Sequence, residues 1–106
     1  MTGSLVGLRG EITLSSYAAS KGAVHGLVRD SAKKLALKNI HVNEIIPGLL
    51  RTAITQNVDD DEFAELVSEN VLGRGTTCEE VAKTVVFLTT LKNVSGQSFF
   101  LDSRII

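Results

Sequence analysis

The sequence has little of what several classes of protein need. Its 106 residues include one cysteine, one proline and no tryptophan. A single cysteine excludes an intramolecular disulfide framework and any metal site built on several thiolates. An excess of charge is also lacking, because 11 basic residues stand against 12 acidic residues and the net charge is −1. We therefore expect no nucleic-acid partner and no membrane-surface partner, since both need a basic face.

Long apolar runs are missing as well. No stretch approaches the roughly 20 apolar residues that span a bilayer. The first four residues lack the basic and apolar regions of a secretory signal, so we expect a cytoplasmic protein. With 43% hydrophobic and 22% charged residues, the composition is that of a globular domain rather than a disordered chain.

The clearest pattern that is present is a long amphipathic helix. Between residues 17 and 38, apolar residues recur at spacings of three and four. The serines at 15–16 can act as the N-cap, and residues 1–14 are predicted to form a loop. Gly22 and Gly26 lower helix stability relative to alanine. Close packing of another helix would explain them, and simple tolerance is the alternative.

Two short strands are predicted after this helix. Residues 40–46 are rich in β-branched side chains, and Pro47-Gly48 ends the run. Its nearly continuous apolar character fits a strand that is buried on both faces. A second strand is predicted over residues 97–101, with core candidates at Phe99, Phe100 and Leu101.

Two further helices are predicted between the strands. The acidic run at 59–62 opens a helix that ends near Asn70, and we interpret these acids as caps rather than as a metal site. Thr77 and Glu80 match a capping box at the start of the next helix. Cys78 lies in its first turn with no base nearby in sequence, so we expect no reactive role for it.

The order of these elements predicts the fold class. A strand, a helical crossover and a second strand indicate parallel pairing and an α/β class. Two parallel strands cannot cover three helices and protect their own edges. Residues 1–106 are therefore predicted to be one partial domain, with two strands and three to four helices of a larger sheet.

One pair of side chains suits acid–base chemistry. Tyr17 and Lys21 are four residues apart, so they share a face of the long helix. A phenol has a pKa near 10 and is a poor acid at neutral pH, but a nearby cation favours the phenolate. Ser4, in the segment upstream, could add a hydroxyl to the same site. The pair alone is also a common surface feature, so it identifies no site by itself.

These residues stand in an order that resembles the C-terminal half of a short-chain dehydrogenase/reductase. Ser4 and the segment 17–21 match the family's Ser and its Tyr-x-x-x-Lys, thirteen positions apart. Asn43, Pro47-Gly48 and Thr52 match the family's Asn-x-x-x-Pro-Gly and the Thr four positions after it. The resemblance spans essentially the whole chain. It is greatest to the bacterial 3-oxoacyl-(acyl-carrier-protein) reductases and related carbonyl reductases.

The resemblance implies a fold and an activity. The fold would be the C-terminal half of a Rossmann-like, doubly wound parallel sheet. The activity would be NAD(P)H-dependent reduction of a carbonyl, such as that of a 3-oxoacyl thioester in fatty acid biosynthesis, to an alcohol. The implied cofactor is NADP(H) or NAD(H), with NADP(H) favoured, and a homo-oligomer would form through helix 17–38. The alternative is a non-catalytic remnant that acts through subunit association.

The resemblance also implies residue roles. Tyr17 would donate the proton, Lys21 would favour its phenolate and hold the nicotinamide ribose, and Ser4 would bind the substrate oxygen. Cofactor contacts are implied for Tyr17, Lys21, Pro47, Gly48, Leu50 and Thr52. We expect Asn43 to be structural, and we expect His25 and His41 to be surface or packing residues. No metal ligand is predicted.

The chain also departs from the family pattern. It lacks the Gly-rich phosphate-binding turn, the Asn-Ala-Gly segment and the upstream catalytic Asn. Residues 101–104 depart from the family's Asp-Gly-Gly. We therefore expect the chain alone to be inactive, and to be marginally stable, oligomeric or aggregation-prone.

Overall fold

A computed structural model describes residues 1–105 of the chain. Its helices and strands, in order, are α1 (Val6–Arg9), α2 (Ser15–Leu35), η1 (Ala36–Lys38), β1 (Glu44–Pro47), η2 (Ala53–Thr55), α3 (Asp60–Leu66), α4 (Cys78–Thr89) and β2 (Ser98–Leu101), where η denotes a 3-10 helix. The predicted α/β class is confirmed.

The two strands pair in parallel. Their register runs from Glu44 opposite Ser98 to Pro47 opposite Leu101. The N-terminal residues lie along the other edge of β1, where Thr2 forms a parallel bridge with Ile45. The Ile45 N–H donates to the Met1 carbonyl, and the Ile45 carbonyl accepts from the Gly3 N–H, both at 2.9 Å. β1 is therefore hydrogen-bonded along both of its edges.

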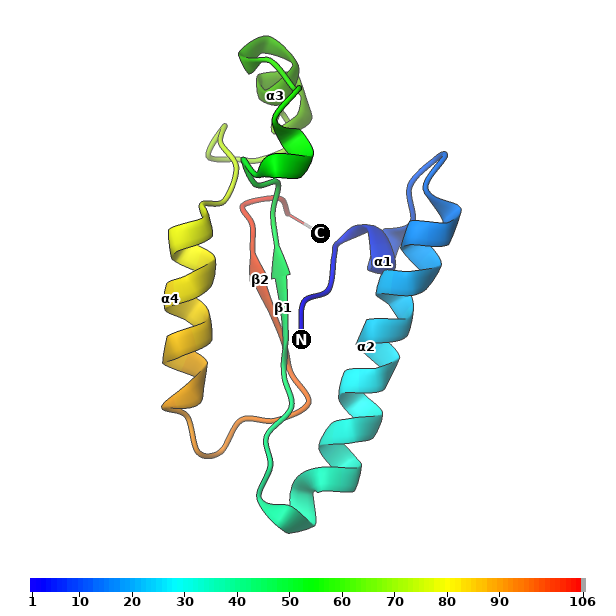
Figure 1. Ribbon diagram of the computed structural model, residues 1–106, viewed down its shortest axis with the longest axis vertical. Coiled ribbons are helices and arrows are strands. Elements are labelled where there is room, and N and C mark those ends of the chain that lie inside the picture. Colours follow the sequence, from blue (N-terminus) through cyan, green and yellow to red (C-terminus); the bar gives the residue numbers. More distant parts are fainter. Residues whose placement is uncertain (106) are drawn as a thin grey trace.

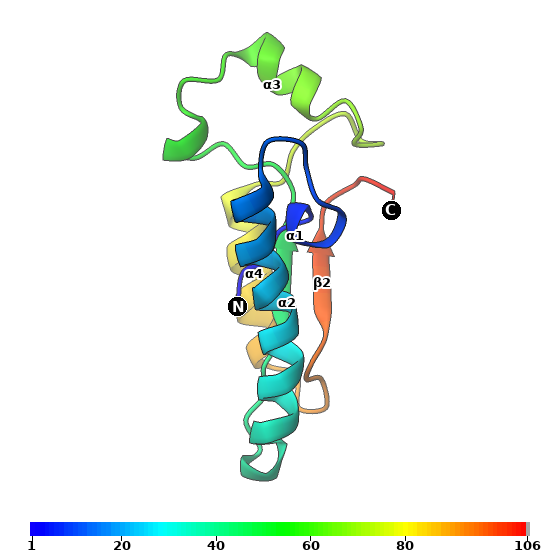
Figure 2. The ribbon, with the colours of Figure 1, turned by 90° about the vertical axis from the view of Figure 1, so that its right-hand side faces the viewer.

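The helices α2 and α4 lie on opposite faces of this small sheet (Figures 1 and 2). Because successive strand residues point to opposite faces, Glu44 and Ile46 share the face that α2 covers. α3 lies beyond the carboxyl ends of the strands (Figure 1). The buried apolar core consists of Leu5, Val28, Ala32, Ile45, Ile46 and Val67.

The expectation that residues 1–14 form a loop is wrong at Val6–Arg9, which form α1. This helix packs on the start of α2 through two glycines. A Cβ atom on Gly7 would lie 2.6 Å from the Lys21 carbonyl carbon, and one on Gly22 would lie 3.1 Å from the Gly7 carbonyl oxygen. Close helix packing therefore explains Gly22. Gly26 has no atom near its missing Cβ and is simply tolerated.

Several predicted boundaries also shift. α2 begins at Ser15 with Leu14 at its N-cap, so the serines lie inside the helix and cap nothing. Asn39 ends the following 3-10 turn in the left-handed conformation. β1 begins at Glu44 rather than at residue 40. The residues just before Glu44 lie beside the turn that precedes β2, so they have no strand to pair with. The Val42 N–H donates to Ser95 Oγ there, at 3.0 Å.

The predicted caps of the later helices are confirmed. Asp59 Oδ1 accepts from the Glu62 N–H at 2.8 Å. Thr77 Oγ1 accepts from the Glu80 N–H at 3.1 Å, and the Glu80 carboxylate accepts in return from the Thr77 N–H at 2.8 Å. α3 ends at Leu66 rather than near Asn70, whose buried amide is bonded instead to the Arg74 carbonyl and to Asp102.

Candidate functional site

The predicted site residues gather at one end of the fold. Ser4 follows the N-terminal residues that pair with β1, Pro47 is the last residue of β1, and Tyr17 lies in the first turn of α2. Figure 1 shows the start of α2 at the end of the sheet to which the strands point. Ligands of open parallel sheets bind at this carboxyl edge.

The Tyr17–Lys21 pair forms as the helical spacing predicts. The Lys21 ammonium nitrogen lies 5.8 Å from the centroid of the Tyr17 ring. The same nitrogen donates to the Thr2 carbonyl at 3.1 Å. The Tyr17 ring is 44% exposed, so the phenol is open to a ligand. A cation next to an accessible phenol is an arrangement suited to proton donation.

Ser4 shares this end of the sheet but is not bonded to the pair. Its Oγ accepts from the Val6 N–H at 3.2 Å, at the start of α1. Within residues 1–105, no hydrogen bond joins Ser4 to Tyr17 or Lys21. The structure therefore places the Ser4 hydroxyl at the start of α1, the helix that packs on the start of α2.

The segment that follows β1 is fixed by its backbone. The Gly48 N–H donates to the Leu101 carbonyl at 2.9 Å and approaches Thr76 Oγ1 at 3.2 Å. A Cβ on Gly48 would lie only 2.6 Å from that oxygen, so the path requires glycine. Leu50 forms a parallel bridge with Thr76. The Thr52 side chain accepts from the Thr55 N–H at the start of η2, which leaves its hydroxyl hydrogen available as a donor.

Arg51 holds the next part of this segment in place. Its guanidinium lies 3.9 Å from the centroid of the Phe63 ring, and it forms an ion pair with Asp60 at 2.7 Å. These contacts attach the residues after β1 to α3. Nothing in the sequence pattern indicates them, because they join residues on separate elements.

The structure also contains a buried polar cluster that the sequence pattern did not predict. Glu44 is 1% exposed, and its Oε2 lies 2.8 Å from His25 Nδ1 and 2.8 Å from Ser98 Oγ. His25 is thus the hydrogen-bond partner of a buried acid, and not merely a surface or packing residue. The available signal was a glutamate inside a strand predicted to be buried on both faces. Such a residue needs a partner.

Asn43 has the structural role that we expected. Its side-chain amide donates to the Val94 carbonyl at 3.0 Å, and its Oδ1 accepts from the Gln97 N–H at 3.1 Å. Both bonds join the start of β1 to the turn that leads into β2. The other histidine, His41, is exposed, and its Nε2 lies 3.4 Å from the Asn39 side-chain oxygen.

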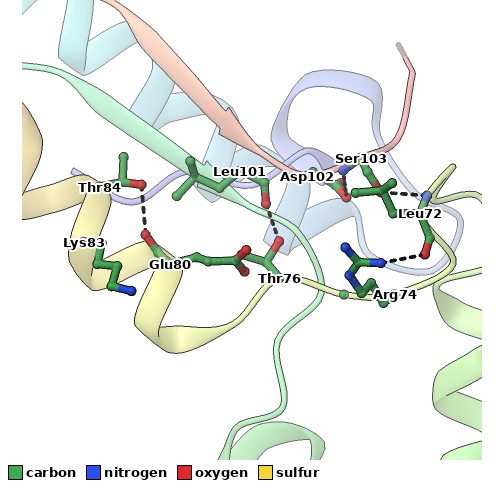
Figure 3. A pocket seen from close by; sticks show the side chains of 10 residues that line it. Leu72, Arg74, Thr76, Glu80, Lys83, Thr84, Leu101, Asp102 and Ser103 are labelled. Atoms are coloured by element: carbon green, nitrogen blue, oxygen red, sulfur yellow. Dashed lines mark hydrogen bonds between the residues drawn. The ribbon is translucent and has the colours of Figure 1, made fainter.

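A cavity of about 430 Å³ adjoins the segment after β1, because its lining residue Thr76 contacts Gly48 and Leu50. Glu80, Lys83 and Thr84 enter it from α4, and residues 101–103 enter it from the end of β2 (Figure 3). None of the predicted site residues lines it. In the described part of the chain, no three His, Cys, Asp or Glu side chains gather as metal ligands. No helix of residues 1–105 is long and apolar enough to cross a membrane.

Comparison with known proteins gives consistent matches. The profile of the family described as enoyl-(acyl carrier protein) reductase matches residues 1–103. A 3-oxoacyl-(acyl-carrier-protein) reductase of Mus musculus is 37% identical over 100 residues, which are 94% of this chain and 41% of that protein. The corresponding reductase of Thermotoga maritima is 35% identical over 105 residues, 97% of this chain and 43% of that protein.

Solved structures agree with these relatives. A 3-hydroxyacyl-CoA dehydrogenase type-2 from Mycobacterium avium superposes with a TM-score of 0.90 at 32% identity. The match covers 99% of this chain and 42% of the other. The chain therefore spans less than half the length of the proteins that it matches.

Proposed function

Because the chain belongs to the short-chain dehydrogenase/reductase family, we propose that it is the catalytic half of an NAD(P)H-dependent reductase. Its substrate would be a carbonyl compound such as a 3-oxoacyl thioester, as in cytoplasmic fatty acid biosynthesis, and its product an alcohol. The observation that carries the proposal is the Lys21 ammonium beside the accessible Tyr17 phenol, at the carboxyl end of the sheet.

Each candidate residue has a role that its position supports. The Tyr17 phenol donates its proton to the substrate oxygen, and the Lys21 ammonium stabilises the phenolate that remains. The Ser4 hydroxyl donates a hydrogen bond to the same substrate oxygen. A bound nicotinamide would supply the hydride that adds to the carbonyl carbon. Hydride and proton together convert the carbonyl to an alcohol.

The residues present fit the nicotinamide end of such a cofactor. Lys21 offers a charged donor for ribose hydroxyls, and the Thr52 hydroxyl and Leu50 backbone offer polar groups for the carboxamide. The pyrophosphate end needs a Gly-rich turn at a helix N-terminus, and the sequence contains no G-x-x-x-G-x-G. Most of the cofactor's binding energy would therefore come from residues outside this sequence.

The test compares two proteins. The 106-residue chain is titrated with NADPH and NADH by fluorescence and assayed with a 3-oxoacyl thioester. The same measurements are made on the chain joined to the N-terminal half of the Thermotoga maritima relative. We expect cofactor binding and turnover only in the joined protein, with NADPH preferred. Turnover by the 106 residues alone would refute the half-domain interpretation. A folded, cofactor-binding joined protein without turnover would refute the reductase.

The alternative is a non-catalytic chain that acts through subunit association. It is favoured by apolar side chains that α4 and β2 leave exposed, at Val85, Val86, Phe87 and Phe100. Homo-oligomer formation through α2 belongs to either proposal, since Leu27 on that helix is 50% exposed. The cofactor titration separates the two, because an associating remnant needs no nicotinamide.

A further inference from the structure

The carboxylate of Glu44 lies at the meeting point of four segments. From β1, its Oε2 accepts from His25 on α2 and from Ser98 on β2. Its other oxygen reaches the N-terminal residues so closely that a Cβ on Gly3 would lie 1.9 Å from it. A buried carboxyl group needs hydrogen-bond partners, and this one has two, His25 and Ser98.

The cluster is not a nucleophilic triad. In such a triad the serine hydroxyl donates to the imidazole, which in turn donates to the acid. Here the Ser98 hydroxyl and the His25 ring donate to the same carboxylate oxygen, and Ser98 Oγ is 3.5 Å from His25 Nδ1. The arrangement holds a helix to a sheet and activates no hydroxyl.

His25 belongs to the same helical stripe as the candidate catalytic pair. Tyr17, Lys21 and His25 follow one another at intervals of four residues, so they lie along one face of α2. Lys21 is bonded to the Thr2 carbonyl, and His25 to the carboxylate beneath Gly3. This face is thus attached at Lys21 to the residues that lead into Ser4 and, one turn later, at His25 to β1 through Glu44, whose carboxyl group lies against Gly3.

α1 packs on the start of α2 at Gly7 and Gly22, and the His25–Glu44 contact joins the same stretch of α2 to β1. The buried residues of α2 are Val28 and Ala32, both beyond His25. The neighbouring charges on α2 are Lys21 and Arg29, and the Arg29 guanidinium donates to the His25 backbone carbonyl at 3.2 Å. From β2 the cluster receives only the uncharged Ser98, and from the N-terminal segment only backbone. Within residues 1–105, His25 and Ser98 are the side chains that are hydrogen-bonded to the Glu44 carboxyl group.

We propose that the His25–Glu44 hydrogen bond is a positioning contact that sets the Tyr17–Lys21 pair against the segment carrying Ser4. The proposal rests on the proposed function only for the roles of Tyr17, Lys21 and Ser4. Removal of the imidazole takes away one of the two side-chain hydrogen bonds of a carboxyl group that is 1% exposed, and α2 then tilts or shifts to bring another donor or water to it. That movement displaces the side chains one and two turns before His25.

The test uses the 106-residue protein labelled with carbon-13 tyrosine. The chain has one tyrosine, so the ring cross-peaks in an NMR spectrum report Tyr17 without assignment. His25→Leu should shift these cross-peaks and lower the Tm by roughly 5–10 °C. His25→Gln, which keeps a donor, should restore part of both. Because no cofactor or substrate is present, the result is independent of whether the reductase proposal holds.

Two matched controls isolate the contact. Ser98→Ala removes the other hydrogen bond to the same oxygen, so it should lower the Tm but leave the Tyr17 cross-peaks in place. His41→Leu removes the exposed histidine and should change neither. If His25→Leu does not fold, Glu44→Met replaces it, because this side chain has a similar length, leaves no buried charge and offers no oxygen to His25. Unmoved Tyr17 cross-peaks in His25→Leu, or in that substitute, would overturn the proposal, and so would an equal shift in Ser98→Ala.

Discussion

The Lys21 ammonium has two neighbours, and each relates it to a different part of the proposed site. It lies 5.8 Å from the Tyr17 ring centroid and 3.1 Å from the Thr2 carbonyl. The ammonium therefore sits between the proton donor and the residues before Ser4. In the proposed mechanism the Lys21 ammonium serves both proton transfer and the ribose, whereas the hydroxyl group of Tyr17 serves proton transfer and its ring remains beside the cofactor.

This difference predicts distinct kinetics for two variants of the joined protein. Tyr17→Phe keeps the ring but removes the proton, so kcat should fall by about 10²–10⁴-fold with an unchanged cofactor Kd. Lys21→Met keeps the length but removes the charge, so kcat should fall and the cofactor Kd should rise roughly 10–100-fold. Steady-state kinetics and cofactor fluorescence measure both quantities. Near-normal turnover in Tyr17→Phe would remove Tyr17 from the proton-donor role.

At this scale, the sequence predicts contacts within one helix and misses those between elements. The Tyr17–Lys21 proximity follows from the four-residue spacing. The His25–Glu44 bond joins α2 to β1, and the stacking of Arg51 on Phe63 joins the segment after β1 to α3. Such contacts depend on how elements pack, and local periodicity carries no information about packing partners.

Among the elements, α1 and α2 approach each other through glycines, and this contact can be tested by paired substitutions. Gly7→Ala would place a methyl group 2.6 Å from the Lys21 backbone, so it should lower the free energy of unfolding. Gly26→Ala meets no atom within 4 Å and should raise it by about 0.5–1 kcal/mol through helix propensity. Urea unfolding followed by circular dichroism measures both. Equal effects of the two substitutions would show that the close approach does not form.

The start of α4 depends on its capping box. Thr77→Ala removes the acceptor for the Glu80 N–H, and it should lower the free energy of unfolding by about 1 kcal/mol. Thr84→Ala is the matched control, because that hydroxyl donates to a carbonyl within the helix. Its effect on urea unfolding should be smaller. A loss of turnover in Thr77→Ala at unchanged stability would instead place Thr77 in the site.

The same cap makes stability depend on pH. Hydrogen bonds from the Thr77 backbone and then its side chain lower the pKa of the Glu80 carboxyl below its usual 4.5. The pKa of Glu80 is lower in the folded protein than in the unfolded chain. The ionised carboxylate therefore stabilises the fold when the pH lies above the pKa of the unfolded chain. This stabilisation is lost as the pH falls through the pKa of Glu80 in the folded protein. Thermal unfolding between pH 3 and 6 should therefore show a smaller dependence on pH in Glu80→Gln, and an unaltered slope would contradict the prediction.

Elements with strong local signals were predicted well, and the others were not. α2 and the capped start of α4 follow from periodicity and from T-x-x-E, which are properties of adjacent residues. α1 was missed because a four-residue helix between glycines has no periodicity of its own. The start of β1 was placed too early. The β-branched residues before Glu44 favour an extended strand, but a strand forms only where a neighbouring strand is available for hydrogen bonding.

The whole molecule is less compact than its length predicts. Its radius of gyration is 15.0 Å, whereas a compact domain of this length has one of about 13 Å. Its accessible surface is 7236 Å², and about 5,800 Å² is typical for this mass. The core candidates Phe99 and Phe100 are not buried, and Phe100 is 44% exposed. Ile45, by contrast, is buried, as the prediction of a strand covered on both faces requires.

This exposed apolar surface predicts that the 106-residue protein associates with itself. Burial of apolar area is favourable by about 25 cal/mol per Å², so self-association relieves the exposure of side chains such as Leu27 on α2 and Val86 on α4. Sedimentation velocity across a range of concentrations should show a species larger than the monomer, and the Tm should rise with concentration. If α2 forms the contact, Leu27→Lys should shift the distribution toward monomer while Val86→Lys should not. The reverse pattern would place the contact on α4, and a monomer at all concentrations would show that the open faces need no partner.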